Sequence, residues 1–459
     1  MPDTTDTLKP LDLLAEFAPV STEAWEAAIA QDLKGADYEK KLVWRTDEGL
    51  SVRPYYRVEH AVARQPLLKP ARSWTLVAPG REPALDASAI EAHDAGATAV
   101  QEVAFVLAQA ADLLAANQPV KTLGFAVGGN HFMEIAKLRA ARMLLPQVSS
   151  AFARANEREP GASFGETHAI HLHVRSASAN KTIYDPYVNL LRVTTEAMSA
   201  VIGGCDSLTI TPCRFDAHLA ENVHHILREE SRLDAVMDPG AGSYYIEALT
   251  DAVARAAWTL FQEIEAAGGF EAYRGSGALE AAVAASREAK AKAVASRRRL
   301  LVGTNNYPNA RERALDAAHE VPPGWRLASA IEAIRLRTER HAKTAGRTPR
   351  VLLLERGDLK MRKARSAFCL NFFGCAGFDI VASDALQEAD LVVLCSSDAE
   401  YLPLAREICP QVAAPVVVAG NPKDQLEELK AAGVADFVHV LSNAAETLTR
   451  WQERLGIKE

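Results

Sequence analysis

The stretch "LLLERGDLKMRKARSAFCLNFFGCAGFDIV" (residues 352–381) has the pattern of a strand, a turn, a helix and a second strand. Three more apolar runs follow at similar intervals, namely "DLVVLC" (390–395), "PVVVAG" (415–420) and "DFVHV" (436–440). Five strands with intervening helices in residues 349–459 predict an α/β domain with a flavodoxin-like, doubly wound sheet.

The turn after the first strand of this domain is the expected ligand position, because open α/β sheets bind ligands outside the carboxyl ends of their strands. This turn carries Lys360, Arg362, Lys363 and Arg365, and no glycine follows Gly357 in it. The composition alone leaves open whether the turn holds an anion or no ligand.

Residues 70–260 alternate between short β-rich runs and longer helical runs. The strand-like runs include "SWTLVA" (73–78), "TLGFAVGGN" (122–130), "AIHLHVRS" (169–176) and "DSLTITP" (206–212). Repeated β and α at this spacing predicts a parallel sheet with helices packed outside it. A TIM-type β/α barrel is the obvious candidate, but such barrels take about 250 residues. Fewer than eight strands are evident here.

The remaining segments complete a predicted division into four parts. Residues 1–65 are expected to form an N-terminal arm for partner contact, residues 66–260 the barrel-like domain, and residues 261–348 a helical linker, with residues 250–345 almost wholly helical. The flavodoxin-like domain occupies residues 349–459.

The arm is expected to contain one amphipathic helix. Ser21 or Thr22 can cap it, Trp25, Ile29 and Leu33 follow at four-residue spacing, and Gly35 is a natural stop. One helix with one apolar stripe cannot bury that stripe by itself, so it is expected to lie on the rest of the chain or on a partner.

The overall composition narrows the class of protein. The 459 residues carry a net charge of −8, which gives no overall bias toward nucleic acid or an anionic membrane. The six cysteines form no CxxC pair, and buried free thiols in a reducing compartment are expected. No signal-like start and no run of eighteen apolar residues is evident, so we expect a cytoplasmic protein.

Three histidines raise the question of a metal site. His168, His171 and His173 lie in "HAIHLHV", and positions 171 and 173 share one face of a strand. No third ligand of suitable type is evident at useful spacing. Histidines inside the barrel or at the strand end are therefore the preferred interpretation, and a metal site is the alternative.

Three other motifs each admit a binding interpretation and a structural one. "GFAVGGNHF" (124–132) could present amides to an anion, or could form a tight turn without a ligand. For "DPGAGSYYIE" (238–247) a turn before an edge strand is preferred. The run Arg297 to Arg299 could bind phosphate, but a solvated helix end is preferred because cations favour the last turn.

Several stretches taken together resemble the adenosylcobalamin-dependent methylmalonyl-CoA mutases. These stretches cover most of the chain in matching order: "FAPVSTEAWEAAIAQDLKGADYEKKLVW", "HDAGATAVQEVAFVLAQAADLL", "FMEIAKLRAARML", "DPYVNLLRVTTEAMSAVIGGCDSLT" and "ILREESRLDAVMDPGAGSYYIEALT". The wording of "KTIYDPYVNLLR" and "LVGTNNYPN" is most similar to the small, catalytically silent subunit of heterodimeric mutases. The resemblance implies a barrel, a helical linker and a C-terminal domain of the cobalamin-binding type.

The sequence departs from the family at the cofactor. In cobalamin-binding members the turn after the first strand of the C-terminal domain carries Asp-x-His-x-x-Gly, whose histidine is the lower cobalt ligand. These three places fall on Lys360, Arg362 and Arg365, or within a residue of them. Arginine stays protonated and offers no lone pair to a metal. The domain is therefore expected to be degenerate, with no cofactor and no metal bound by this chain.

The sequence also departs from the family in the barrel. Catalytic chains place a histidine directly after Ser-Leu, where this chain has Thr209. They carry Arg-Gln-Tyr-Ala-Gly after the first barrel strand, where this chain reads "SWTLVAPGREP" (73–83). The stretch between Trp74 and His93 is shorter than in full-length relatives. We therefore expect no catalytic residue and a barrel shortened by several βα units.

The leading hypothesis is a non-catalytic small subunit that pairs with a homologous large subunit. That large subunit would hold adenosylcobalamin and the acyl-CoA substrate, and the complex would interconvert methylmalonyl-CoA and succinyl-CoA. The alternative is an acyl-CoA mutase that is active by itself and holds cobalamin without a histidine lower ligand. A third hypothesis, a nucleic-acid or anion binder, has little support because aromatic residues do not alternate with the basic ones.

Overall fold

The structure of the chain is a computed structural model that describes residues 15–62, 71, 73–155 and 170–458. The chain divides into two compact units, Met1–Tyr56 and Arg57–Glu459. Among the described residues, no helix combines the length and the apolar composition that a bilayer crossing requires.

The first unit contains helices α1 (Thr22–Asp32) and α2 (Tyr38–Leu42) and an antiparallel pair of strands, β1 (Trp44–Arg45) and β2 (Ser51–Val52). The Ser21 hydroxyl caps α1, as the sequence predicts, by accepting a hydrogen bond from the Ala24 N–H at 3.2 Å. No side chain of α1 is buried, and Trp25 keeps 46% of its surface exposed. The apolar stripe of α1 is therefore available to another surface.

Five parallel strands form the sheet of the barrel-like domain, in the order β4-β5-β6-β7-β3. They are β3 (Thr75–Leu76), β4 (Ala87–Ser88), β5 (Thr122–Val127), β6 (His171–Ser176) and β7 (Ser207–Thr209). In a β/α barrel, strands adjacent in sequence lie side by side, and the first strand closes the ring against the last. Here β3 pairs with β7, while the described residues show no pairing between β3 and β4. This is the strand order of a barrel that lacks an arc between β3 and β4.

The missing arc lies where the sequence predicts a shortened barrel. Residues 77–86 alone connect β3 to β4. Ten residues are too few for a strand-helix-strand crossover, which needs a dozen or more. The predicted α/β class is confirmed, and the described part of the barrel domain is an open sheet.

Helices pack on one face of this sheet and on one another. They are α4 (Ala99–Ala115), α5 (His131–Ala155), α6 (Pro186–Ile202), α7 (Ala217–His225), the π-helical turn η3 (Ile226–Glu230) and α8 (Tyr244–Ala266). Helix α3 (Ile90–Ala95) begins on the opposite face, where Ile90 packs with Ala126. Strand side chains on the covered face, such as Phe125, Val174 and Leu208, are fully buried. The edge strand expected after "DPGAGS" is wrong, because the Ser243 hydroxyl caps α8 at that place.

The linker is only partly helical. Its helices are α9 (Phe270–Gly275), α10 (Ala278–Ala295) and α11 (Ser329–Ala345), with the short 3₁₀ turn η4 (Leu315–Glu320) between the last two. The expectation of nearly continuous helix is wrong for residues 296–328. Asn305 explains the stop, because its side-chain amide donates to the carbonyls of Val294 and Arg299, both at 2.9 Å. Arg297 then turns the chain with a φ of 57°.

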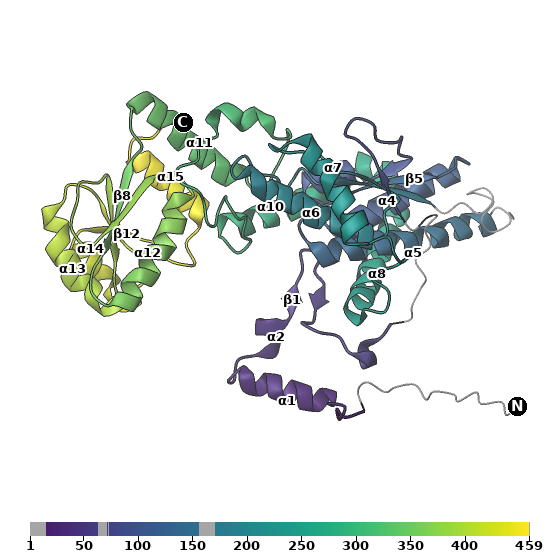
Figure 1. Cartoon of the computed structure of the whole chain (residues 1–459), viewed down its shortest axis with the longest axis horizontal. Coiled ribbons are helices and arrows are strands. Elements are labelled where there is room, and N and C mark those ends of the chain that lie inside the picture. Colours follow the sequence, from purple (N-terminus) through teal and green to yellow (C-terminus); the bar gives the residue numbers. More distant parts are fainter. Residues whose placement is uncertain (1–14, 63–70, 72, 156–169, 459) are drawn as a thin grey trace, which may run out of the picture. The chain divides into compact units, whose positions relative to one another are not determined.

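The C-terminal domain has the predicted doubly wound sheet, in the order β12-β11-β10-β8-β9. Its strands are β8 (Arg350–Glu355), β9 (Asp379–Ser383), β10 (Leu391–Cys395), β11 (Val416–Val418) and β12 (Val434–Phe437). Helices α12 (Leu359–Gly374) and α15 (Ala444–Arg454) cover one face together with α11, while α13 (Tyr401–Ile408) and α14 (Leu426–Ala431) cover the other (Figure 1). The order reverses between β8 and β10, which makes their carboxyl ends the switch point of the sheet.

Candidate functional site

The turn at the switch point is shorter than the sequence suggests. β8 ends at Glu355 and α12 begins at Leu359, so three residues separate them. The Asp358 carboxylate caps α12 by accepting from the Met361 N–H at 2.8 Å. The basic residues of the predicted turn therefore lie on α12 itself, and the turn proper has no length to fold around a bulky ligand.

The basic side chains of α12 have different surroundings. Lys360 is exposed and Arg362 is half-buried. Lys363 pairs with Glu355 at the end of β8, and Arg365 lies 3.1 Å from Asp398 in the loop after β10. Two of the four cations are thus held by carboxylates of their own domain.

A carboxylate of the chain itself occupies the switch point. Glu400 accepts hydrogen bonds from the hydroxyls of Ser396, at 2.7 Å, and of Ser397. It also accepts from the Ser397 N–H at 3.2 Å and from the Asp358 N–H at 3.1 Å. These donors come from the loops after β8 and β10. We call Gly357, Asp358, Ser396, Ser397 and Glu400 the switch-point cluster.

The switch-point cluster depends on its charge and on its glycine. Hydrogen bonds from the two serine hydroxyls lower the pKa of Glu400 to about 2, so the group is ionised at neutral pH. Gly357 has a φ of 75°, and a Cβ on it would lie 2.2 Å from Glu400 Oε2. Only glycine lets the turn approach the carboxylate this closely.

The opposite face of the first sheet is polar along β6 and β7. His171, His173 and Arg175 alternate along β6, and Ser207 and Thr209 lie beside them on β7. The Ser207 hydroxyl is 2.7 Å from His171 Nε2 and 2.8 Å from His173 Nδ1. Burial lowers the pKa of His173 to about 4, so this imidazole is neutral at physiological pH.

The histidines share one hydroxyl and do not converge on a common ligand position with other donors. Within the described ranges, no group of three or more His, Cys, Asp or Glu side chains could hold a metal ion. His168, the third histidine of the motif, lies outside the described residues. Thr209 is fully buried, and its hydroxyl has no hydrogen-bond partner among them. A threonine hydroxyl can donate a hydrogen bond but cannot take up a proton near neutral pH.

The connector between β3 and β4 lies against this polar face. Leu85 packs on the cluster of Ile90, Ala126 and Ala177. A Cβ on Gly124 of β5 would lie 2.5 Å from Leu85 Cδ1. The connector therefore fills part of the space that the centre of a complete barrel would occupy.

Two cavities adjoin the carboxyl ends of the strands, and the larger one also adjoins the connector at Glu82 and Leu85. Their volumes are about 910 Å³ and about 460 Å³, and both are lined by Arg175 and Arg287. The smaller one is also lined by Lys181, whose ammonium is held by Glu196 at 2.8 Å and by Asn180. The lysine charge is thus already neutralised within the protein.

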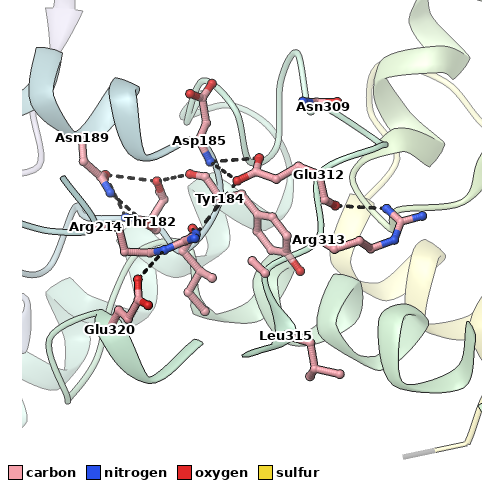
Figure 2. Close-up of polar contacts among 12 residues, drawn as sticks. Thr182, Tyr184, Asp185, Asn189, Arg214, Asn309, Glu312, Arg313, Leu315 and Glu320 are labelled. Carbon is pink, nitrogen blue, oxygen red and sulfur yellow. Dashed lines mark hydrogen bonds and ion pairs between the residues drawn. The ribbon is translucent and has the colours of Figure 1, made fainter. Parts of the chain in front are cut away.

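The loop after β6 is joined to the linker by a polar network (Figure 2). The Asp185 N–H donates to both carboxylate oxygens of Glu312, at 3.0 and 3.1 Å. Arg214 donates to the Ile183 carbonyl and pairs with Glu320 at 3.3 Å. Asp185 and Arg214 have φ values of 56° and 58°, which are unfavourable for residues other than glycine. These contacts fix the loop that carries "KTIYDPYVNLLR".

Sequence reasoning missed two residues of these sites. Glu400 is the third residue of a capping box that begins at Ser397, and the Ser-x-x-Glu spacing could have indicated it. Arg297, expected at a solvated helix end, is half-buried, and its guanidinium lies 5.5 Å and 5.9 Å from the ring centroids of Phe368 and Phe372. No local pattern predicts this contact across more than seventy residues of sequence.

Comparisons with known proteins find similar sequences over most of the chain. The family model described as Methylmalonyl-CoA mutase matches residues 78–352. The chain is 32% identical to the "Methylmalonyl-CoA mutase small subunit" of Porphyromonas gingivalis, with 97% of this chain and 99% of that protein covered. It is also 32% identical to the small subunit of Streptomyces virginiae, over 82% of this chain and 64% of that protein. A "Methylmalonyl-CoA mutase" of Cereibacter sphaeroides is 36% identical over 49% of this chain and 33% of its own length.

The chain is shorter than these relatives. It covers less than two thirds of the Streptomyces virginiae protein. The alignment with the Porphyromonas gingivalis protein extends over 623 positions, whereas this chain has 459 residues, so at least 164 positions face gaps in this chain. A gap of this total size corresponds to several βα units of a barrel.

Proposed function

Because the chain belongs to the methylmalonyl-CoA mutase family, we propose that it is the non-catalytic small subunit of a heterodimeric mutase. A homologous large subunit would carry the adenosylcobalamin and interconvert methylmalonyl-CoA and succinyl-CoA. This chain would stabilise that subunit. The names of its relatives in Porphyromonas gingivalis and Streptomyces virginiae support the assignment to the small subunit.

The switch-point cluster is the observation that carries the proposal. A cobalt ion below the corrin needs a donor with a free lone pair, and Lys360, Arg362 and Arg365 offer none in their charged forms. The residues present therefore do not fit cobalamin. Glu400 already takes the hydrogen-bond donors at this edge of the sheet. Burying an unpaired guanidinium beside a corrin would cost several kcal/mol in addition.

Partner binding is supported by the first unit. Helix α1 has exposed apolar side chains and three acidic residues, and none of its side chains is buried. We propose that this arm contacts the large subunit, and that the complex works in the cytoplasm, where the six free thiols stay reduced.

Co-expression with a large mutase chain that has an intact Asp-x-His-x-x-Gly tests the proposal. We expect the two chains to co-elute, and the large chain alone to lose activity or stability. Separate elution at micromolar concentration, with a fully active large chain, would contradict it.

A second experiment separates this function from that of a mutase active by itself. The purified chain is mixed with adenosylcobalamin and desalted, and the corrin absorbance is measured. We expect no retained absorbance. Retention at one equivalent per chain would support a mutase without a histidine ligand instead.

A further inference from the structure

The switch-point cluster has the composition of an anion site. Four donors point at one carboxylate: the hydroxyls of Ser396 and Ser397 and the N–H groups of Ser397 and Asp358. Ser396 is fully buried, so its hydroxyl cannot turn to bulk water when the carboxylate is absent. Donors fixed in this way favour an anion over a neutral group.

A capping box explains only part of this arrangement. The box consists of the Ser397 hydroxyl, the Ser397 N–H and the Glu400 carboxylate at the start of a helical segment. The Ser396 hydroxyl lies outside the box, and the Asp358 N–H comes from a loop forty-two residues earlier. Helix capping alone does not require these two additional donors.

The cluster is also accessible and close to positive charge. Glu400 is half-exposed, so its carboxylate position opens to solvent. The Arg365 guanidinium, on α12, lies 3.1 Å from Asp398, which is two residues before Glu400. The Asp358 carboxylate is directed to the Met361 N–H and is not among the groups that face Glu400.

We propose that the switch-point cluster is a phosphate-class anion site whose occupant in this chain is the Glu400 carboxylate. The tethered carboxylate outcompetes any free anion because it needs no association from solution. Removal of this side chain leaves four donors around a space of similar size, and a tetrahedral oxyanion can accept from all of them. The inference stands apart from the proposed function, since it needs neither cobalamin nor a partner subunit.

The test compares Glu400→Ala with the unmodified chain in millimolar inorganic phosphate and in chloride of equal ionic strength. We expect a saturable rise in the unfolding temperature of Glu400→Ala in phosphate, and no saturable rise for the unmodified chain. Adding Ser396→Ala to the variant should weaken the phosphate response about tenfold or more, because one donor to the anion is lost.

Glu446→Ala is the matched control. Glu446 is the third residue of α15, and its carboxylate accepts from the side-chain amide of its own cap, Asn443. This variant therefore reports any general effect of phosphate on stability. An equal response of Glu446→Ala, or the absence of a saturable response in folded Glu400→Ala, would overturn the proposal.

The proposal can still be tested if the Glu400→Ala variant folds poorly. If Glu400→Ala is unfolded in chloride, recovery of its far-ultraviolet circular dichroism in phosphate supports the proposal, and failure to recover overturns it. Glu400→Gln keeps the shape without the charge, and its phosphate response should be weaker than that of Glu400→Ala. A stronger response would argue against a site that the side chain fills.

Discussion

Lys137 is a buried cation that depends on ion pairing. Its ammonium is fully buried, 2.8 Å from Glu102 and 2.5 Å from Glu134. Burial acts to lower the pKa of Lys137, but the two carboxylates outweigh it and the pKa is raised. The group is therefore charged, and it pairs with two carboxylates that have little access to water.

Lys137→Met should destabilise the chain by about 3–5 kcal/mol, because it removes the cation from the buried Glu134 carboxylate and leaves Glu102 with His93. Lys430→Met is the control, since Lys430 forms an exposed pair with Glu427 and should change stability by less than about 0.5 kcal/mol. Urea unfolding measures both. Equal losses of unfolding free energy in the two variants would show that the buried ion pairs stabilise the fold no more than the exposed pair does.

His224 makes stability depend on pH. It is buried and accepts a hydrogen bond from Trp74 Nε1 at 3.1 Å, and burial lowers its pKa from 6.5 to about 4. Between these values the unfolded chain binds a proton that the folded chain does not, so stability falls as pH falls from 6.5 to 4.

His224→Gln keeps an acceptor for Trp74 and removes the titration. The slope of unfolding free energy against pH between 4 and 6.5 should decrease by about 1.4 kcal/mol per pH unit. Urea unfolding at a series of pH values measures it, and an unchanged slope would assign the pH dependence to other groups.

At the scale of secondary-structure elements, the β8–α12 turn depends on Gly357. Gly357→Ala would place a Cβ 2.2 Å from the Glu400 carboxylate, in addition to the strain of a φ of 75°. Gly346→Ala is a matched control, because Gly346 has a φ of 73° and nothing within 4 Å of the added Cβ.

Gly346→Ala should cost about 1 kcal/mol from backbone strain alone. Gly357→Ala should cost at least 1 kcal/mol more, since Glu400 must move away from its donors. Denaturant unfolding of the two variants gives the difference. Equal losses of unfolding free energy in the two variants would show that Glu400 can move aside without lowering stability.

The linker segment before α11 is held by Glu339. Its carboxylate accepts from the Tyr184 hydroxyl at 2.8 Å and from the N–H groups of Ala314 and Leu315 at 2.9 and 3.0 Å. Glu339→Gln should speed amide exchange at these two N–H groups about tenfold or more, because hydrogen bonds to a charged acceptor are stronger.

Hydrogen exchange with mass spectrometry measures this effect. Glu320→Gln serves as the control, since Glu320 is half-exposed in its pair with Arg214 and should leave the exchange of residues 309–320 nearly unchanged. Equal protection in both variants would contradict the role given to Glu339.

The sequence predicts elements better than it predicts contacts. The strands β8 and β10 are long apolar runs that need no tertiary information, and the order of the C-terminal sheet follows from β/α alternation. The irregular path of residues 296–328 could not be predicted, because the side chain of Asn305 ends the helix from ten residues beyond it. The position of Glu400 at the centre of the switch-point cluster could not be predicted in full, because two of the groups that donate to it lie outside its capping box.

For the whole molecule, the proposed function makes the first unit dispensable for folding and necessary for assembly. Removal of residues 1–56 should leave the unfolding temperature of the second unit nearly unchanged, because the chain divides after Tyr56. The affinity for the large subunit should fall at least tenfold, since the exposed apolar side chains of α1 are lost.

The substitution Trp25→Ser tests the same point without a truncation, because Trp25 is the largest exposed apolar side chain of α1. Its matched control is Phe132→Ser on α5 of the second unit, because Phe132 is also 46% exposed. Isothermal titration with the large subunit measures both affinities. An arm variant that binds as tightly as the unmodified chain would place the interface elsewhere.

The strand order of the first sheet has a consequence for how molecules could reach its polar side. A complete ring admits a long, thin molecule only end-on, so escape requires the whole length to slide out. With β3 and β4 unjoined, the connector of residues 77–86 lies beside the polar side of the sheet, where Leu85 packs on it. His173 and Thr209 on that side are fully buried, so a loop, and not a closed ring of strands, limits how far a molecule can enter beside β6.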